Sequence, residues 1–278
     1  MRTTAPNDKF ATRSLFAWGE RTFVMGIINL SPDSFSHDGL SSVDGAVAQA
    51  TRLVAEGADV IDIGGESTRP GAASISAEEE IRRVVPVVER LHHELNVPLS
   101  VDTYKYDVAR AAAAAGVSIL NDISGLRDDF QLASLAAEHR LPIIITANQR
   151  GLMVTGDIMA QVIADLREAI RHCRETGVDA ASIIVDPGLG FGKTAAQNLE
   201  IIRRLPELKV LGCPIMLGPS RKSFIGLTLG LPVDERLEGT AAAVALGIAF
   251  GTDIVRVHDV KEMARVARLS DAVVRGRV

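Results

Sequence analysis

Charged and amide side chains follow most of the short apolar runs of this chain, at the points where those runs end. In chain order they are Asn29, residues 66–69, Asp102, Asn121 with Asp122, residues 148–150, Asp186, residues 220–222, and Arg256 with His258. A single Asn or Asp in such a place is usually a helix cap or a turn residue, because its side chain binds free backbone amides. Capping does not explain Lys222, Arg256 and His258, so we interpret the set as one site.

One half of this set suits a flat heterocycle. Asp102, Asn121 and Asp186 supply hydrogen-bond acceptors and one amide donor, which match a ring with a guanidine-like N–H face. Lys222 adds a donor for a ring carbonyl or ring nitrogen. A hydrogen bond to a charged group contributes about 1.5–3 kcal/mol, and a group left unpaired is costly. Such a pocket therefore discriminates strongly against analogues of its ligand.

The other half suits an anion. Arg256 and His258 are cationic or hydrogen-bond-donating groups, and Asn29 offers an oxygen ligand for a hard metal ion. These groups fit a phosphate or a diphosphate. A ring-binding set beside an anion-binding set predicts a heterocyclic substrate that carries a phosphorylated leaving group.

Eight short aliphatic or β-branched runs must position these side chains. They span residues 23–28, 59–63, 98–101, 117–120, 141–146, 182–185, 213–217 and 253–257. A stretch with helical character follows each run, and Ser76 and Glu79 have the spacing of a helix-capping box. Gly57, Gly116 and Gly177 stand where helices should end. Continuous apolar strands indicate burial on both faces, so the pattern predicts a single (β/α)8 TIM barrel with its site at the carboxyl ends of the strands.

A doubly wound sheet is the alternative arrangement for alternating strands and helices. Its phosphate-binding motifs do not match the sequence. The segment DPGLGFGKT, residues 186–194, ends like a P-loop, but Pro187 stands where the first glycine is required. Glycines 188, 190 and 192 also break the G-x-G-x-x-G spacing.

Composition narrows the class of protein further. The chain has 278 residues, 47% hydrophobic content and a formal net charge of −5, and its acidic and basic residues are interspersed. We therefore expect no nucleic-acid or membrane partner. The longest uncharged apolar segment, residues 239–252, has about 14 residues and is too short to span a bilayer. Scattered charges near the N-terminus argue against a signal peptide or anchor, and Cys173 and Cys213 form no metal or redox motif, so we expect a soluble, cytoplasmic protein.

Seven segments resemble the dihydropteroate synthase family, in order and at matching spacing. They are GIINLSPDSFS (26–36), DIGGESTRPGA (62–72), SVDTYK (100–105), LNDISG (120–125), VDPGLGFGKT (185–194), GPSRKSFIG (218–226) and VRVHDV (255–260). The resemblance covers residues 23–278. It implies one pterin-binding barrel domain there, and residues 1–22 are then an N-terminal extension, either a frayed arm or a plug at the bottom of the barrel.

The resemblance also implies a reaction. In this family the aromatic amine of p-aminobenzoate displaces diphosphate from (7,8-dihydropterin-6-yl)methyl diphosphate, giving 7,8-dihydropteroate for folate biosynthesis. The family pattern assigns the pterin ring to Asp102, Asn121, Asp186 and Lys222.

Further roles follow from the same resemblance. Asn29 is expected to help hold Mg²⁺ and the diphosphate, with Arg256 and His258 as anion ligands. Residues expected at p-aminobenzoate or in a mobile loop over the substrates are Thr68, Arg69, Pro70, Ser220, Phe35 and Phe191. The N-terminus of the helix after Ser220 is expected to meet the p-aminobenzoate carboxylate. Family members are commonly homodimers, and sulfonamides resemble p-aminobenzoate, so we expect a homodimer that sulfonamides inhibit.

Two places differ from the family pattern. Many members have Met-His after the fifth strand, where this chain has Thr146 and Ala147, a change that affects packing or polar contacts beneath the pterin. In the first loop, other members place an acidic residue directly after the serine, where this chain has His37 followed by Asp38. The sequence leaves open which of the two approaches the metal.

Two alternative functions stay open at this point. A methyltetrahydrofolate:corrinoid methyltransferase shares the barrel and a similar ring-binding set, but residues 220–222, the pair Arg256 and His258, and the STRPG loop suit diphosphate and p-aminobenzoate better. A non-catalytic pterin-binding paralogue is suggested by Thr146 and Ala147.

Overall fold

Eight parallel strands form the centre of the protein in this computed structural model, which describes residues 15–30, 42–67, 73–127, 130–152 and 155–276. The strands are β1 Phe23–Asn29, β2 Val60–Gly64, β3 Leu99–Asp102, β4 Ile119–Asp122, β5 Ile143–Thr146, β6 Ile183–Asp186, β7 Met216–Leu217 and β8 Ile254–Val257. Their order in the sheet is β6-β5-β4-β3-β2-β1-β8-β7. A parallel bridge between Val185 and Ile215 joins β6 to the segment before β7. The sheet thereby closes into the predicted (β/α)8 barrel.

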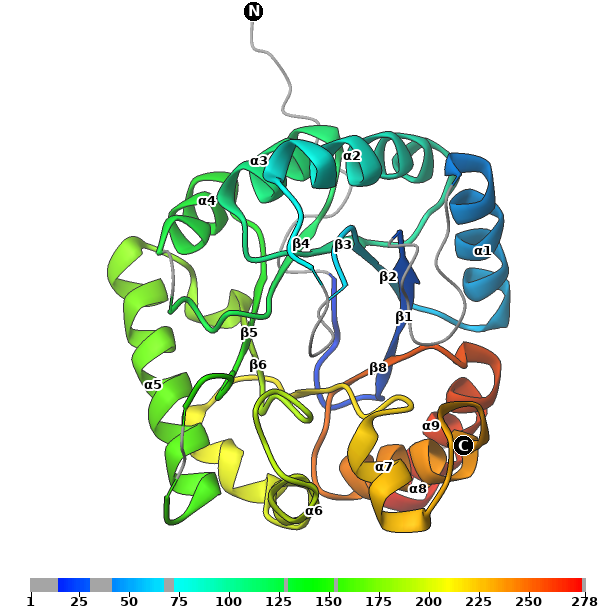
Figure 1. Cartoon of the computed structure of the whole chain (residues 1–278), viewed down its shortest axis with the longest axis vertical. Helices are drawn as coiled ribbons and strands as arrows, with labels where there is room; N and C mark the ends of the chain where they lie inside the picture. The colour runs from blue at the N-terminus through cyan, green and yellow to red at the C-terminus, as the bar shows by residue number, and fades with distance from the viewer. Residues whose placement is uncertain (1–14, 31–41, 68–72, 128–129, 153–154, 277–278) are drawn as a thin grey trace, which may run out of the picture.

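Helices surround the strands on the outside only, as Figure 1 shows. They are α1 Val43–Glu56, α2 Ala77–Glu94, α3 Tyr106–Ala115, α4 Gln131–His139, α5 Ile158–Thr176, α6 Ala195–Arg203, α7 Ser223–Leu229, α8 Leu237–Ala249 and α9 Val260–Arg275. Two of them, α7 and α8, lie between β7 and β8 in the chain. A closed barrel inside a ring of helices excludes the doubly wound alternative. Among the described residues, no helix is both long enough and apolar enough to cross a membrane.

The helix boundaries follow the signals in the sequence. Ser76 Oγ accepts the backbone N–H of Glu79 at 3.2 Å and so caps the start of α2. Gly57, Gly116 and Gly177 end α1, α3 and α5 with φ angles of 110°, 119° and 102°. These left-handed conformations strain residues that carry a Cβ, which explains why glycine stands at each position.

The barrel interior has an apolar layer near the amino ends of the strands. Its members are Phe23, Met25, Val60, Ile119, Ile144, Ile184, Met216 and Ile254. Leu15, Phe16 and Trp18 pack against this layer from the segment before β1. Side chains alternate along a strand, so the next inward-facing positions toward the carboxyl ends form the floor of the mouth. There the interior becomes polar.

Candidate active site at the barrel mouth

Three predicted site residues lie on one row across strands β1 to β4. Asn29 is in register with Gly64, Gly64 with Asp102, and Asp102 with Asn121. Residues in register on neighbouring parallel strands point to the same side of a sheet. A Cβ placed on Gly64 would lie 3.7 Å from Asp102 Cβ and 3.9 Å from Asn29 Oδ1. The barrel therefore brings these polar groups together at its mouth, as the sequence predicts.

Arg256 on β8 links this row to a carboxylate that the sequence analysis did not single out. Its Nε donates to Asp62 Oδ2 at 2.6 Å, and its Nη2 donates to Asp102 Oδ2 at 2.5 Å. The same Asp62 oxygen accepts Asn121 Nδ2 at 3.1 Å. Burial alone would lower the pKa of Arg256, but Asp62 and Asp102 raise it above its ordinary value. The guanidinium thus stays charged beside Asp102, one of the predicted ring-binding residues.

Three oxygen atoms of this group are buried without a hydrogen-bond partner among the described residues: Asp62 Oδ1, Asp102 Oδ1 and Asn121 Oδ1. A buried acceptor without a partner costs about 1–3 kcal/mol, so native proteins seldom keep several together. Their clustering indicates a site that accepts N–H donors from a ligand.

The carboxyl group of Asp102 has an unusual proton affinity. Burial raises its pKa to about 7, although the positive charge of Arg256 opposes this change. Asp102 therefore titrates near neutral pH. Only its ionised form can use both oxygens as acceptors.

Asp186 and Lys222 face each other across Gly218. A Cβ on Gly218 would lie 3.9 Å from Asp186 Oδ2 and 3.8 Å from Lys222 Nζ. Asp186 Oδ1 accepts the backbone N–H of Gly188 at 2.7 Å, which fixes the carboxylate plane. Burial lowers the pKa of Lys222 to about 8, and Asp186 opposes this change. The absent side chain at residue 218 leaves an acceptor and a donor with space between them.

Phe191 lies between two cations at the rim of the mouth. Lys222 Nζ is 4.8 Å and Arg150 Cζ is 4.5 Å from the centroid of its ring. Both distances suit cation–π attraction, which holds the ring in place. The lysine also donates to the carbonyl of Leu189. The segment after β6 therefore turns an aromatic face toward Lys222, which the sequence predicts to bind the ring.

Ser220 does not point into open space. Its side chain is buried, and its Oγ accepts the backbone N–H of His258 at 3.1 Å and lies 2.9 Å from Nδ1 of the same residue. Helix α7 begins three residues later, at Ser223. The structure thus brings Ser220 together with the predicted anion ligand. Arg221 forms a two-bond ion pair with Asp259.

Lys193, in the glycine-rich segment that ends like a P-loop, has a structural role. Its Nζ donates to the backbone carbonyls of Ala147 and Gly188 at 2.8 Å each and lies 3.3 Å from the carbonyl of Phe191. Gly188 has φ 70°, and a Cβ there would lie 2.0 Å from the Ala147 oxygen. The ammonium group of Lys193 thus links the end of β5 to the segment after β6. Its hydrogen bonds go to backbone carbonyls, and it does not act as a P-loop lysine that binds phosphates. The sequence analysis missed this role.

Thr146 and Ala147 point to opposite sides of β5. Ile145 and Ala147 belong to the core between strands and helices, whereas Ile144 belongs to the barrel interior. Alternation therefore places Thr146 inside, next to Asp186 in register. The two residues that depart from the family pattern thus face different sides of the strand, although Thr146 also contributes to the pocket that Ala147 lines.

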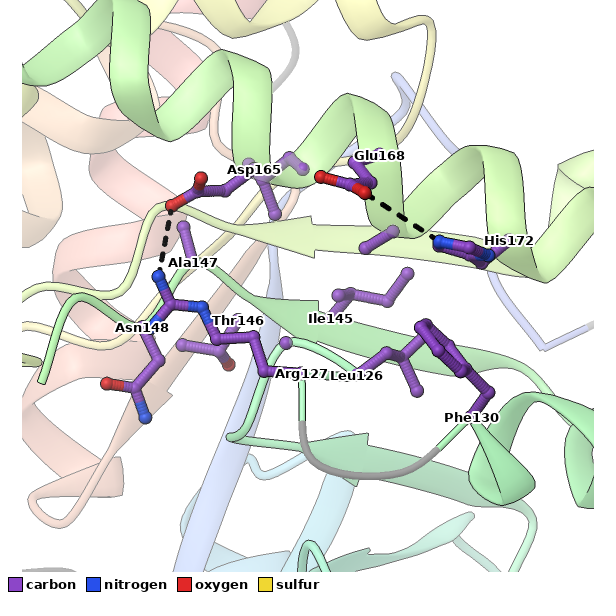
Figure 2. Close-up of a pocket in the computed structure, with 13 residues that line it drawn as sticks. Leu126, Arg127, Phe130, Ile145, Thr146, Ala147, Asn148, Asp165, Glu168 and His172 are labelled. Atoms are coloured by element: carbon purple, nitrogen blue, oxygen red, sulfur yellow. Dashed lines mark ion pairs between the residues drawn. The ribbon is translucent and has the colours of Figure 1, made fainter. Parts of the chain in front are cut away.

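Ala147 lines a pocket of about 200 Å³ behind β5, beside α5 and the segment after β4. Figure 2 shows two ion pairs at this pocket. Arg127 Nη2 is 3.8 Å from Asp165 Oδ2, and His172 Nε2 is 3.8 Å from Glu168 Oε1. The small side chain of Ala147 leaves room here, outside the barrel mouth.

Several predicted residues lie outside the described part of the chain: Phe35, His37, Asp38, Thr68, Arg69 and Pro70. Within the described ranges, no cluster of three His, Cys, Asp or Glu side chains suits a metal ion. Asp62 was missed because we considered residues that follow each strand. Its signal was a charged residue within an apolar run, two positions after Val60 and so on the same face of the strand.

Comparisons with known proteins agree with this geometry. The model of the pterin binding enzyme family matches residues 25–258. The dihydropteroate synthase of Bacillus subtilis is 50% identical over 261 residues, covering 94% of this chain and 91% of the relative. A Clostridium difficile dihydropteroate synthase crystallised in the presence of pteroic acid has a TM-score of 0.89 and 48% identity, covering 94% of this chain and 99% of the other. A Xanthomonas albilineans dihydropteroate synthase with 4-aminobenzoic acid has a TM-score of 0.86 and 42% identity, covering 91% and 93%.

Proposed function

Because the chain belongs to the pterin-binding enzyme family as a dihydropteroate synthase, we propose that its barrel mouth holds a pterin ring beside a diphosphate. The enzyme is a transferase of folate biosynthesis. It joins (7,8-dihydropterin-6-yl)methyl diphosphate to p-aminobenzoate and releases diphosphate and 7,8-dihydropteroate. The assignment of the ring pocket rests on the cluster of unpaired buried oxygens at Asp62, Asp102 and Asn121.

Four residues bind the pterin ring in this proposal. Asp102 and Asn121 accept N–H groups through their unpaired Oδ1 atoms. Asp186 accepts from the guanidine-like edge, and Lys222 donates to a ring carbonyl or ring nitrogen. Gly218 leaves the space between the last two groups into which the ring edge fits.

The diphosphate lies toward Asn29, His258 and Arg256. An imidazole and a guanidinium supply hydrogen-bond donors and positive charge for phosphate oxygens. Asn29 offers one amide oxygen, which suits Mg²⁺, because this ion takes hard oxygen ligands, few of them from protein, and shares phosphate oxygens. When bound, Mg²⁺ supplies positive charge against the leaving group.

The residues of the mouth assist the reaction through charge and position. The bond between the pterin methylene carbon and the diphosphate oxygen breaks, the amine nitrogen of p-aminobenzoate bonds to that carbon, and one amine proton leaves with the diphosphate or to water. An aryl amine is a weak nucleophile, so stabilising the departing diphosphate is the main task of Arg256 and His258. The carboxylates of Asp102 and Asp186 stabilise positive charge that develops on the pterin methylene. No side chain needs to form a covalent intermediate.

The p-aminobenzoate site lies at the rim, near Phe191 and the start of α7. Phe191 contributes a buried aromatic face, and Ser220 lies just before the start of α7 at this site. Phe35, Thr68, Arg69 and Pro70 complete the site in our proposal. Sulfonamides share the aromatic amine and acidic group of p-aminobenzoate, so we expect them to compete at this rim.

A homodimer is the assembly we propose, formed through α6, α7 and α8. An apolar groove of about 350 Å³ runs between these helices. Leu199, Leu229 and Leu246 line it and are 44%, 51% and 50% exposed. Exposed apolar patches of this kind mark interaction surfaces. A second copy of the chain would cover them.

Two further assignments from the sequence stay proposals. We assign residues 23–278 to the barrel domain and residues 1–22 to an extension, whose residues Leu15, Phe16 and Trp18 pack on the apolar layer. We also propose a cytoplasmic location, which suits two free cysteines.

Ligand affinities test the division of the mouth into two halves. We expect Arg256→Ala to weaken binding of the diphosphate-bearing substrate more than binding of bare 6-hydroxymethylpterin. Calorimetry measures both affinities. Because Arg256 also bonds Asp62 and Asp102, a smaller loss for the bare ring is expected too. Equal losses for both ligands would contradict the anion role.

A further inference from the structure

Asp62 contributes one of the unpaired buried oxygens of the mouth, but the proposed pockets do not explain its contacts with Asn121 and Arg256. Its side chain is 0% exposed. It is in register with Ile27 and Ser100, two residues before the row of Asn29, Gly64 and Asp102, so it lies one inward layer deeper. We propose that Asp62 is a positioning residue, which orients the side-chain amide of Asn121 so that this residue reads the pterin ring as an acceptor. This role rests on the proposed pterin pocket.

The hydrogen-bond chemistry of the pair determines the amide orientation. An asparagine side chain has an NH₂ donor and a carbonyl acceptor, and either can face a given neighbour. An ionised carboxylate only accepts, so Asn121 must present its NH₂ to Asp62, and the two atoms are 3.1 Å apart. The opposite orientation would place two oxygens against each other in a buried layer.

The orientation of Nδ2 determines where the other end of the Asn121 amide, Oδ1, points. With Nδ2 held by Asp62, Oδ1 of Asn121 is directed away from that carboxylate. This oxygen is buried and has no hydrogen-bond partner among the described residues. Asn121 can therefore accept an N–H from a ring through Oδ1, while one of its two N–H groups stays on Asp62. At Oδ1 the residue favours a ring edge that carries a donor.

Arg256 offsets the free-energy cost of burying the Asp62 carboxylate. Its Nε donates to the same Asp62 oxygen that accepts Asn121 Nδ2. A buried carboxylate without a cationic partner is strongly unfavourable. The guanidinium offsets this charge, and its second bond, to Asp102, ties the arrangement to the neighbouring ring-binding residue. The orienting carboxylate and its counterion thus form one unit below the pterin pocket.

A double-mutant cycle on pterin affinity tests the proposal. The variants are Asp62→Asn, Asn121→Ala and the combination, and the ligand is bare 6-hydroxymethylpterin, measured by calorimetry. Asp62→Asn keeps the shape but allows an NH₂ to face Asn121, so the amide of Asn121 is free to turn. We expect about a tenfold loss of affinity, the size of one hydrogen bond to a charged group. In the Asn121→Ala background the same change should cost less than about twofold.

Two outcomes would overturn the proposal. Unchanged affinity in Asp62→Asn would show that the carboxylate is not needed, and losses that multiply in the double variant would show that Asp62 acts independently of Asn121. Ser100→Ala is the matched control, because Ser100 is buried in the same layer and its Oγ has no partner among the described residues. We expect the control to bind like the native chain. Failure of the native chain to bind the pterin would instead refute the proposed pocket itself.

A second measurement serves if Asp62→Asn does not fold. The Nδ2 protons of Asn121 should exchange slowly with solvent in the native, ligand-free protein, because they face a buried carboxylate. Nitrogen-edited NMR, with Asn121→Ala to assign the signal, measures this rate. Exchange as fast as that of an exposed asparagine would contradict the proposed orientation.

Discussion

The hydroxyl oxygen of Ser220 lies 2.9 Å from Nδ1 of His258 and accepts the backbone N–H of the same residue at 3.1 Å. These two contacts join the segment after β7 to the end of β8. They hold the imidazole plane and direct its other nitrogen, Nε2, away from the serine. In the proposed site, Ser220 therefore positions the imidazole of His258, the predicted anion ligand.

Replacement of Ser220 tests this relationship. We expect Ser220→Ala to weaken binding of the diphosphate-bearing pterin about fivefold, because a neutral hydrogen bond contributes about 0.5–1.5 kcal/mol. Bare 6-hydroxymethylpterin should bind as before. Calorimetry with both ligands checks the difference, and Ser134→Ala, on the exposed face of α4, is the matched control. Equal changes for both ligands would argue against a role through His258.

Asp186 is the residue whose loss should affect the ring most directly. Its Oδ1 is already bonded to Gly188 N at 2.7 Å, and its Oδ2 faces Gly218. We expect Asp186→Ala to weaken the binding of bare 6-hydroxymethylpterin by about 10- to 100-fold. The substitution removes charge-assisted hydrogen bonds, which contribute about 1.5–3 kcal/mol each. Calorimetry measures this loss. An unchanged dissociation constant would show that Asp186 does not bind the ring.

The pH dependence of pterin affinity should have two limbs. Burial raises the pKa of Asp102 to about 7, so affinity should rise as pH increases through this value and the acceptor ionises. Burial lowers the pKa of Lys222 to about 8, so affinity should fall above it as the donor loses its proton. Calorimetry from pH 5 to pH 10, with the ligand's own titration measured separately, gives the profile.

Single substitutions assign each limb. Asp102→Asn should remove the acidic limb and Lys222→Met the basic one. A native profile that is flat after correction for the ligand would contradict both assignments.

Lys193 should stabilise the fold in a pH-dependent way. Burial lowers its pKa to about 7, against an ordinary value of 10.5 in the unfolded chain. Between these values the unfolded chain holds the proton more tightly, so the contribution of this residue to stability should increase from pH 7 to pH 10. Urea unfolding at pH 7 and pH 9 should therefore show a smaller pH effect in Lys193→Met than in the native chain.

The variant should also be less stable than the native chain by about 1–3 kcal/mol, because backbone carbonyls lose their donor. Lys261→Met, at an exposed position on α9, is the control and should behave like the native chain. The same pH effect in Lys193→Met and the native chain would refute the role.

The dimer is tested at the centre of the apolar groove. Leu246→Glu places a charge where the second copy would pack, so sedimentation equilibrium should show a dimer for the native chain and a monomer for the variant. Leu269→Glu is the control, because Leu269 is exposed on α9 and does not line the groove. A native chain that is monomeric at all concentrations would contradict the proposed interface.

The sequence predicts the barrel well because its signals are local. Apolar runs, capping residues and terminal glycines depend on neighbouring residues, and the predicted strands agree with the observed ones to within a few residues. The largest difference at one end of a strand is three residues, at the start of the seventh strand, predicted over 213–217 and observed as Met216–Leu217. There Ile215 still pairs with Val185, but only as an isolated bridge.

The site was harder to predict, because it depends on contacts between distant strands. The predicted ring-binding residues do converge, since each lies at or after the carboxyl end of a strand of a closed barrel. The hydrogen bond from Arg256 to Asp62 joins residues 194 positions apart, and no local sequence pattern predicts this contact. The role of Lys193 depends on the carbonyl of Ala147, which belongs to a different loop. Arg256 and Lys193 each act through a partner that is distant in the sequence and comes near only when the chain folds.

Diphosphate release is the most direct test of the central claim. The native chain should release diphosphate from (7,8-dihydropterin-6-yl)methyl diphosphate only when p-aminobenzoate is present, and it should form 7,8-dihydropteroate in equal amount. Asp186→Ala, assayed in parallel, should lose most of this turnover. Pterin binding by the native chain without any diphosphate release would contradict the synthase assignment and identify a pterin-binding protein without catalysis.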